Sequence, residues 1–141
     1  MTNDRPNNDL HGETLVRYWL EKAQEALESA KSEHEAGRLS FAVNRIYYAC
    51  FYAVSAVLRE RGKKFKKHKG VRSALHRDMV KNGVIEERWG RFYDDVFESR
   101  QRGDYQPIVS FEPEQVEEYI RQADGFLKEM EKLLIRKPSP H

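Results

Sequence analysis

Residues 99–105, SRQRGDY, carry side chains that can act on a phosphate group. A guanidinium such as that of Arg100 stabilises negative charge, and cleavage of a phosphodiester also needs a general base. Asp104, with an ordinary pKa of about 3.9, and Tyr105, at about 10, match neutral pH less well than histidine does. The three residues are therefore a candidate catalytic set without a good base. The alternative is that Arg100 and Asp104 pair or cap at a helix end.

A run of positive charge extends over residues 59–77. It holds nine lysines and arginines against one acid, Glu60, although the whole chain has a formal net charge of only +2. Such a segment suits phosphate contacts, with Phe65 stacking on a base, but a solvated loop or a loop that faces an acidic protein has the same composition. The predicted nucleotide- or RNA-binding residues are Arg45, Lys63, Lys64, Lys66, Lys67, His68, Lys69, Arg100 and Arg102.

The stretch NRIYYACFYAVSAVL, residues 44–58, is apolar apart from its opening and one serine. Arg45 shares a helix face with Tyr48 and Tyr52, and a buried arginine needs a carboxylate partner. Either an inter-helix ion pair or a polar pocket with Arg100 and Tyr105 explains why Arg45 stands in an otherwise apolar helix. The candidate partners for the ion pair are Asp104, Asp94, Asp95 and Glu98. The aromatic residues Tyr47, Tyr48, Phe51 and Tyr52 are expected to be core rather than base-stacking platforms.

Other classes of site have little support in the sequence. A single cysteine, Cys50, excludes a disulfide framework, and His68 and His76 lack partners at metal-ligand spacing, so we expect neither a metal nor a cofactor. The apolar run 46–58 is too short to span a bilayer, and the first twelve residues contain no apolar signal region. Cytoplasm is the expected location.

Hydrophobic periodicity predicts an all-α, antiparallel bundle of about five helices. Gly37 and Gly62 indicate helix ends, and Pro113 indicates a first turn. The second helix is apolar all round and should be central. We expect a disordered lead over 1–12, a single domain over 13–136 and a loose tail over 137–141. The helices are predicted over 13–36, 39–61, 71–81, 84–102 and 113–136, with Gly103 interrupting the fourth.

Three segments resemble, in chain order, the HEPN domain family and most closely its small stand-alone prokaryotic branch. They are NRIYYACFYAVSAVL, KHKGVRSALHRDMVKNG (67–83) and SRQRGDY, and the resemblance covers about residues 15–135. It implies an antiparallel helical bundle, often a homodimer. Many family members are ribonuclease toxins with an Arg-x(4–6)-His motif at the end of a bundle helix, and they are commonly paired with a small nucleotidyltransferase that acts as antitoxin.

The sequence departs from that motif, because Asp104 or Tyr105 stands where the ribonuclease branch has histidine. The spacing Arg-x(6)-His occurs between Arg61 and His68, but on the basic loop. Ribonuclease turnover is therefore expected to be absent or very slow near neutral pH, and enzymatic activity stays an open question. The leading hypothesis is a nucleotide- or RNA-binding protein that acts beside a nucleotidyltransferase in a toxin–antitoxin-like pair. The alternatives are a metal-independent ribonuclease toxin and a non-catalytic homodimeric interaction module.

Overall fold

The computed structural model describes residues 5–65, 67–106 and 110–135, and these residues form helices and no strands. The elements in chain order are α1 (Arg5–Glu35), α2 (Leu39–Glu60), α3 (His68–Ala74), the π-helical segment η1 (Leu75–Val80), α4 (Glu87–Tyr105) and α5 (Pro113–Ile135). The predicted all-α bundle is confirmed.

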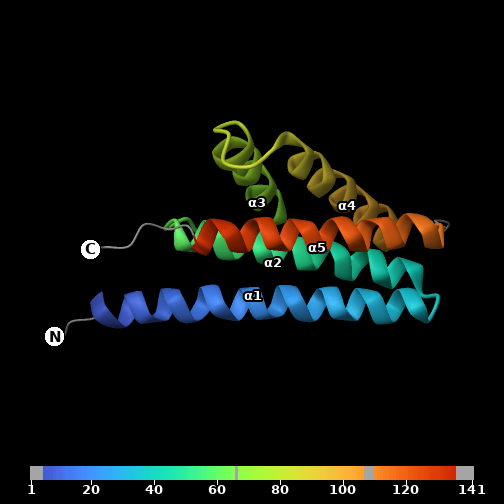
Figure 1. Ribbon diagram of the computed structural model, residues 1–141, viewed down its shortest axis with the longest axis horizontal. Helices are drawn as coiled ribbons and strands as arrows, with labels where there is room; N and C mark the ends of the chain where they lie inside the picture. The colour runs from blue at the N-terminus through green and yellow to red at the C-terminus, as the bar shows by residue number, and fades with distance from the viewer. Residues whose placement is uncertain (1–4, 66, 107–109, 136–141) are drawn as a thin grey trace.

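The long helices run lengthwise beside one another (Figure 1). The chain direction reverses between α1 and α2 and again between α4 and α5, as in an antiparallel bundle. The shorter α3 and the tilted α4 lie on one side of the α2–α5 pair. On this side of the bundle, Arg72 of α3 forms an ion pair with Asp94 of α4.

Helix α2 is the central element, as its composition predicts. It packs against α1, α5, α4 and α3, and twelve of its residues are buried. Its length and hydropathy also meet the criteria for a membrane span, but 67% of the qualifying window is buried inside the bundle. That burial is what a core helix of a water-soluble bundle requires.

Helix boundaries confirm part of the sequence prediction and correct the rest. Gly37 and Gly62 have φ of +80° and +81° and end α1 and α2, as predicted. Helix α1 begins at Arg5, within the segment 1–12 that the sequence predicts to be a disordered lead; residues 1–4 and the predicted tail 137–141 lie outside the described residues. Helix α3 begins at His68 instead of residue 71.

Helix α4 does not stop at Gly103 but continues to Tyr105. A Cβ at residue 103 would lie 3.2 Å from the Phe111 ring, so the glycine allows this ring to lie close to the backbone of α4. Phe111 is buried. The glycine that the sequence presents as a helix breaker is therefore a packing position, and Asp104 belongs to the last turn of α4.

Candidate nucleic-acid interface

Arg100 lies near the end of α4, where this helix packs on the first turns of α2. Its guanidinium carbon is 4.7 Å from the ring centre of Tyr47 and 5.6 Å from that of Tyr48. Both distances are within the range of cation–π attraction. Arg100 is only 8% exposed, so a full positive charge is buried against the rings of Tyr47 and Tyr48.

The hydrogen bonds of Arg100 are few for a buried guanidinium. Nη1 donates one long bond to the Tyr48 hydroxyl, 3.4 Å, and lies 3.6 Å from Oδ2 of Asp104. Nε is buried and has no partner among the described residues. A guanidinium has five N–H donors, and buried polar groups are normally hydrogen-bonded. Arg100 therefore retains capacity to bind an anion.

Asn44 and Arg45 extend this cluster along the start of α2. Asn44 Nδ2 donates to Oδ2 of Asp104 at 3.4 Å, and its Oδ1 accepts from Nε and Nη2 of Arg45 at 3.1 and 2.9 Å. The Arg45 guanidinium carbon lies 5.2 Å from the ring centre of Tyr48, the same ring that Arg100 approaches. Two guanidinium groups thus share one tyrosine.

His68, the first residue of α3, completes the cluster from the basic loop. Its Nδ1 is hydrogen-bonded to the Tyr47 hydroxyl at 2.7 Å, and its ring stacks on Phe51 with centres 4.4 Å apart. Burial lowers the pKa of His68 from its usual value, and the charge of Arg100 lowers it further. The imidazole is therefore neutral near pH 7 and able to accept a proton.

The Tyr47 hydroxyl stays protonated, because burial raises the pKa of Tyr47 to about 12. It can donate to Nδ1, or it can accept from Nδ1 when that atom carries the proton. The second arrangement leaves Nε2 of His68 as a free acceptor. In that tautomer the cluster combines a neutral base, a buried cation and a partly exposed surface.

Comparison with known proteins places the chain in a family. The model of the HEPN domain matches residues 16–133, which is most of the chain. The chain belongs to the HEPN domain family. A solved structure, the crystal structure of TT1696 from Thermus thermophilus, has a similar fold with a TM-score of 0.72 and 19% identity. That likeness covers 84% of this chain and 97% of the other.

Relatives of this HEPN protein have similar length. It is 48% identical to a "UPF0332 protein" of Thermotoga maritima over 86% of this chain and 92% of the relative. It is 33% identical to "Putative toxin MJ0605" of Methanocaldococcus jannaschii over 91% and 93%. It is 30% identical to "Putative toxin MJ0142" of the same organism over 84% and 80%. The relatives thus include proteins named as toxins.

We call the group formed by Arg100, Asp104, Asn44, Arg45 and His68 around Tyr47 and Tyr48 the Arg100 cluster. It contains only part of the predicted catalytic set. The Arg100–Asp104 pair forms, as the structural alternative predicts. Tyr105 is 75% exposed, and no contact of its hydroxyl with Arg100 is present among the described residues. An imidazole that the motif did not predict lies near Arg100, because His68 is hydrogen-bonded to the Tyr47 hydroxyl and the Arg100 guanidinium lies over the Tyr47 ring.

The prediction that Arg45 pairs with a carboxylate is wrong. The residue is half-buried, and its partner is the adjacent amide of Asn44. The aromatic residues follow the core prediction: Tyr47 is fully buried, and Tyr48, Phe51 and Tyr52 are partly buried against the core. The polar roles of Asn44 and the Tyr47 hydroxyl were missed. Their spacing of i, i+3 with Tyr48 at i+4 marks one helix face and is the available signal.

The other predicted basic residues lie on the loop after α2, at the start of α3 and, in the case of Arg102, on α4. Lys63 pairs with Asp78 at 3.2 Å, and Arg102 is exposed and donates to the Ser99 hydroxyl at 3.2 Å. Lys66 lies outside the described residues. The exposed predicted cations are Lys63, Lys64, Lys67, Lys69 and Arg102. Within the part of the chain that the structure describes, no three potential metal ligands gather into a site.

Proposed function

We propose that this HEPN protein binds the phosphate of a nucleotide or an RNA at the Arg100 cluster. The observation that carries the proposal is that the buried guanidinium of Arg100 makes few hydrogen bonds and that its Nε has no partner among the described residues. Charge-assisted bonds from arginine to phosphate are among the strongest hydrogen bonds in proteins. A phosphate would supply the acceptors that Tyr48 and Asp104 provide only at long distance.

Asp104 is the group that such a phosphate would displace. Its carboxylate has the same sign of charge as a phosphate and contacts Arg100 and Asn44 only at 3.6 and 3.4 Å. Because the residue is exposed in the last turn of α4, it can move aside without disturbing the core. Arg100, Arg45 and Asn44 would then donate to the ligand.

The biological setting we propose is a toxin–antitoxin-like pair in which this chain acts as a homodimer beside a small nucleotidyltransferase. Relatives named as toxins support the first part. The partner and the dimer follow from the family resemblance. Expression of this chain alone should slow growth, and co-expression of its nucleotidyltransferase should restore it. Normal growth on strong expression of the folded protein would contradict the toxin role.

Binding is tested with a labelled UpU dinucleotide carrying 2′-O-methyl groups, which cannot be cleaved by 2′-hydroxyl attack. Arg100→Met should weaken binding by about 10- to 100-fold, because hydrogen bonds to charged groups contribute about 1.5–3 kcal/mol. The matched control is Arg121→Met on α5, an exposed arginine paired within its own helix. Equal affinities for both variants, each folded by circular dichroism, would contradict the proposal.

A second function, metal-independent RNA cleavage, is favoured by the position of His68. Nε2 would take the proton from the 2′-hydroxyl, and the 2′-oxygen would attack phosphorus. Arg100 would stabilise the phosphorane, and the P–O5′ bond would break as O5′ takes a proton from water, leaving a 2′,3′-cyclic phosphate. This replaces the weak bases Asp104 and Tyr105 with an imidazole.

Cleavage is measured on unmodified RNA with EDTA present. His68→Gln should lower the rate by about 10²–10⁴-fold, the usual contribution of a general base, whereas His76→Gln should not. No cleavage by the wild-type protein, or cleavage that survives His68→Gln, would remove this second function and leave the binding function standing.

A further inference from the structure

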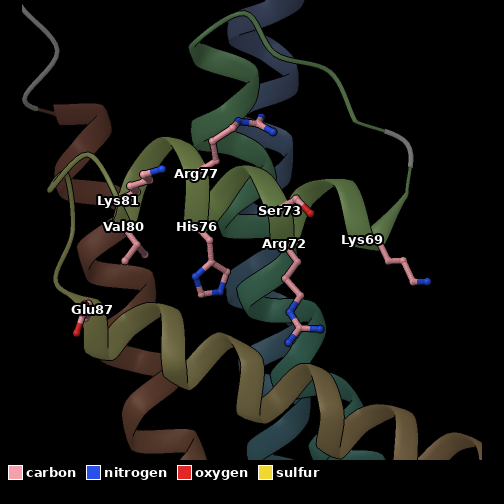
Figure 2. A pocket seen from close by; sticks show the side chains of 8 residues that line it. All are labelled: Lys69, Arg72, Ser73, His76, Arg77, Val80, Lys81 and Glu87. Atoms are coloured by element: carbon pink, nitrogen blue, oxygen red, sulfur yellow. The ribbon is translucent and has the colours of Figure 1, made fainter.

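An open cavity of about 840 Å³ lies beside α3 and η1, apart from the Arg100 cluster. Figure 2 shows its lining side chains, which come from α3, from η1 and the following Lys81 and, on the opposite side, from Glu87 at the start of α4. Five of the lining residues are basic and one is acidic: Lys69, Arg72, His76, Arg77, Lys81 and Glu87. We call this surface the α3–η1 pocket.

One carboxylate of α4 holds two of the side chains that line the pocket. Oδ1 of Asp94 accepts from Arg72 Nε at 2.8 Å and is 2.9 Å from His76 Nε2. The π-helical turn carries His76 against α4, and a Cβ on Gly90 would lie 2.9 Å from both His76 and Val80. π-Helical turns frequently occur at functional sites. The pocket is therefore an ordered surface rather than a loose loop.

The rim of the pocket has positive charge that the protein does not neutralise. Arg72 is matched by Asp94 and Glu98, and Arg77 by Asp78. Lys69 and Lys81 are exposed and form no ion pair within the described residues. The same holds for Lys64 and Lys67, which precede α3. Such unpaired cations suit a polyanion, because each phosphate contact releases counterions.

Helix α3 connects the pocket to the Arg100 cluster. His68 belongs to the cluster, and the next residue, Lys69, lines the pocket. The Arg72 guanidinium lies 4.4 Å from the ring centre of Phe97, and Phe97 packs edge-on against Tyr47 at 5.7 Å. Arg100 lies over the same Tyr47. The two surfaces are thus separated by two aromatic rings.

We propose that the ligand is a single RNA strand that occupies both surfaces, with one phosphate at the Arg100 cluster and later phosphates in the α3–η1 pocket. This inference rests on the proposed function and narrows its ligand from a nucleotide or an RNA to an RNA strand. A single nucleotide has no group that would use Lys69 and Lys81. An acidic partner protein is the competing occupant, and the test separates the two.

The test compares 2′-O-methyl oligouridylates of two and eight nucleotides over a range of salt concentrations. Lys69→Ser/Lys81→Ser should weaken binding of the octanucleotide and leave binding of the dinucleotide unchanged. It should also flatten the log–log salt dependence by about 0.7 for each phosphate of a single strand that the protein no longer neutralises. The matched control is Lys128→Ser/Lys132→Ser, which removes the same charge from α5, where both lysines are ion-paired.

The outcomes distinguish this inference from the proposed function. If Arg100→Met weakens dinucleotide binding but the pocket variant binds the octanucleotide with wild-type affinity and salt slope, the strand proposal is wrong and phosphate binding at Arg100 stands. If the pocket variant loses only a co-purifying acidic protein, the strand proposal is equally wrong. If Arg100→Met changes the binding of neither ligand, the proposed function is wrong, and the strand proposal that rests on it is wrong as well.

Discussion

Arginines on two sides of this bundle are in opposite situations. On α5, Arg121 has a side chain that is 63% exposed and lies beside Glu117 and Glu118, one turn away. On α4, the Arg100 side chain is 9% exposed and meets the carboxylate of Asp104 only at 3.6 Å. The first arrangement keeps a helix surface solvated at little energetic cost, whereas the second keeps a charge buried with incomplete bonding. Stability alone does not explain the second arrangement, and we propose that ligand binding does.

The same contrast extends to the lysines. Lys128 and Lys132 on α5 pair with Asp124 and Glu129 at i,i+4 and i,i+3 spacing. Around α3, Lys67 and Lys69 have no such partner within the described residues. The near-zero net charge of the chain therefore conceals one neutralised face and one face with available cations.

Replacing Gly90 should give the largest effect on stability, because it tests whether the α3–η1–α4 face is built to a fixed geometry. In Gly90→Ala the new Cβ meets His76 and Val80 at 2.9 Å. Overpacking of this kind costs about 1–3 kcal/mol in the free energy of unfolding. Gly12→Ala in α1, where nothing lies within 4 Å, is the control in urea titrations. Equal stability of the two variants would mean that the face is pliable.

Arg100→Met tests the claim that this charge is retained for function. Removing a buried, poorly paired charge is often neutral or stabilising, so we expect the free energy of unfolding to stay within about 1 kcal/mol of wild type or to rise. Ligand binding should fall in the same variant. A loss of about 3 kcal/mol or more, measured by urea unfolding, would instead identify Arg100 as a structural residue.

Asp104→Asn tests the same site by changing the carboxylate partner of Arg100. The amide removes the negative charge that competes with a phosphate for Arg100 and keeps the size of the side chain. We expect affinity for the uncleavable dinucleotide to rise by a few-fold, since partly exposed charge pairs contribute at most about 1 kcal/mol. Weaker binding by Asp104→Asn would show that the carboxylate orients the ligand and is not displaced.

His68 should make a small, pH-dependent contribution to stability. Its folded-state pKa is lowered, so between that pKa and the unfolded value near 6.5 the unfolded chain binds more protons. Stability is then fully present above the unfolded pKa and is lost as pH falls through the folded pKa. Urea unfolding at about pH 7.5 and about pH 5.5 should show a larger loss for wild type than for His68→Gln. An equal loss would place the imidazole in solvent.

Local patterns in the sequence predicted the helices, the central position of α2 and the Arg100–Asp104 pair, since all depend on periodicity, glycine positions or i,i+4 spacing. Contacts between elements that are far apart in the sequence could not be predicted from such local patterns. His68 is hydrogen-bonded to Tyr47, which lies 21 residues away in the sequence. Asp94 of α4 is hydrogen-bonded to Arg72 of α3 and to His76 of η1. The end of α4 was predicted wrongly at Gly103, because the glycine is required by the Phe111 ring packed against it and not by a helix end.

The most direct test of phosphate binding observes the Arg100 side chain itself. In ¹⁵N-labelled protein, the Arg100 Nε–H resonance is assigned by its loss in Arg100→Lys and followed during titration with the uncleavable dinucleotide. We expect a saturable shift of this resonance, whose nitrogen is buried without a partner among the described residues, and none for Arg121. Saturable binding that shifts other resonances and leaves Arg100 unchanged would contradict the account.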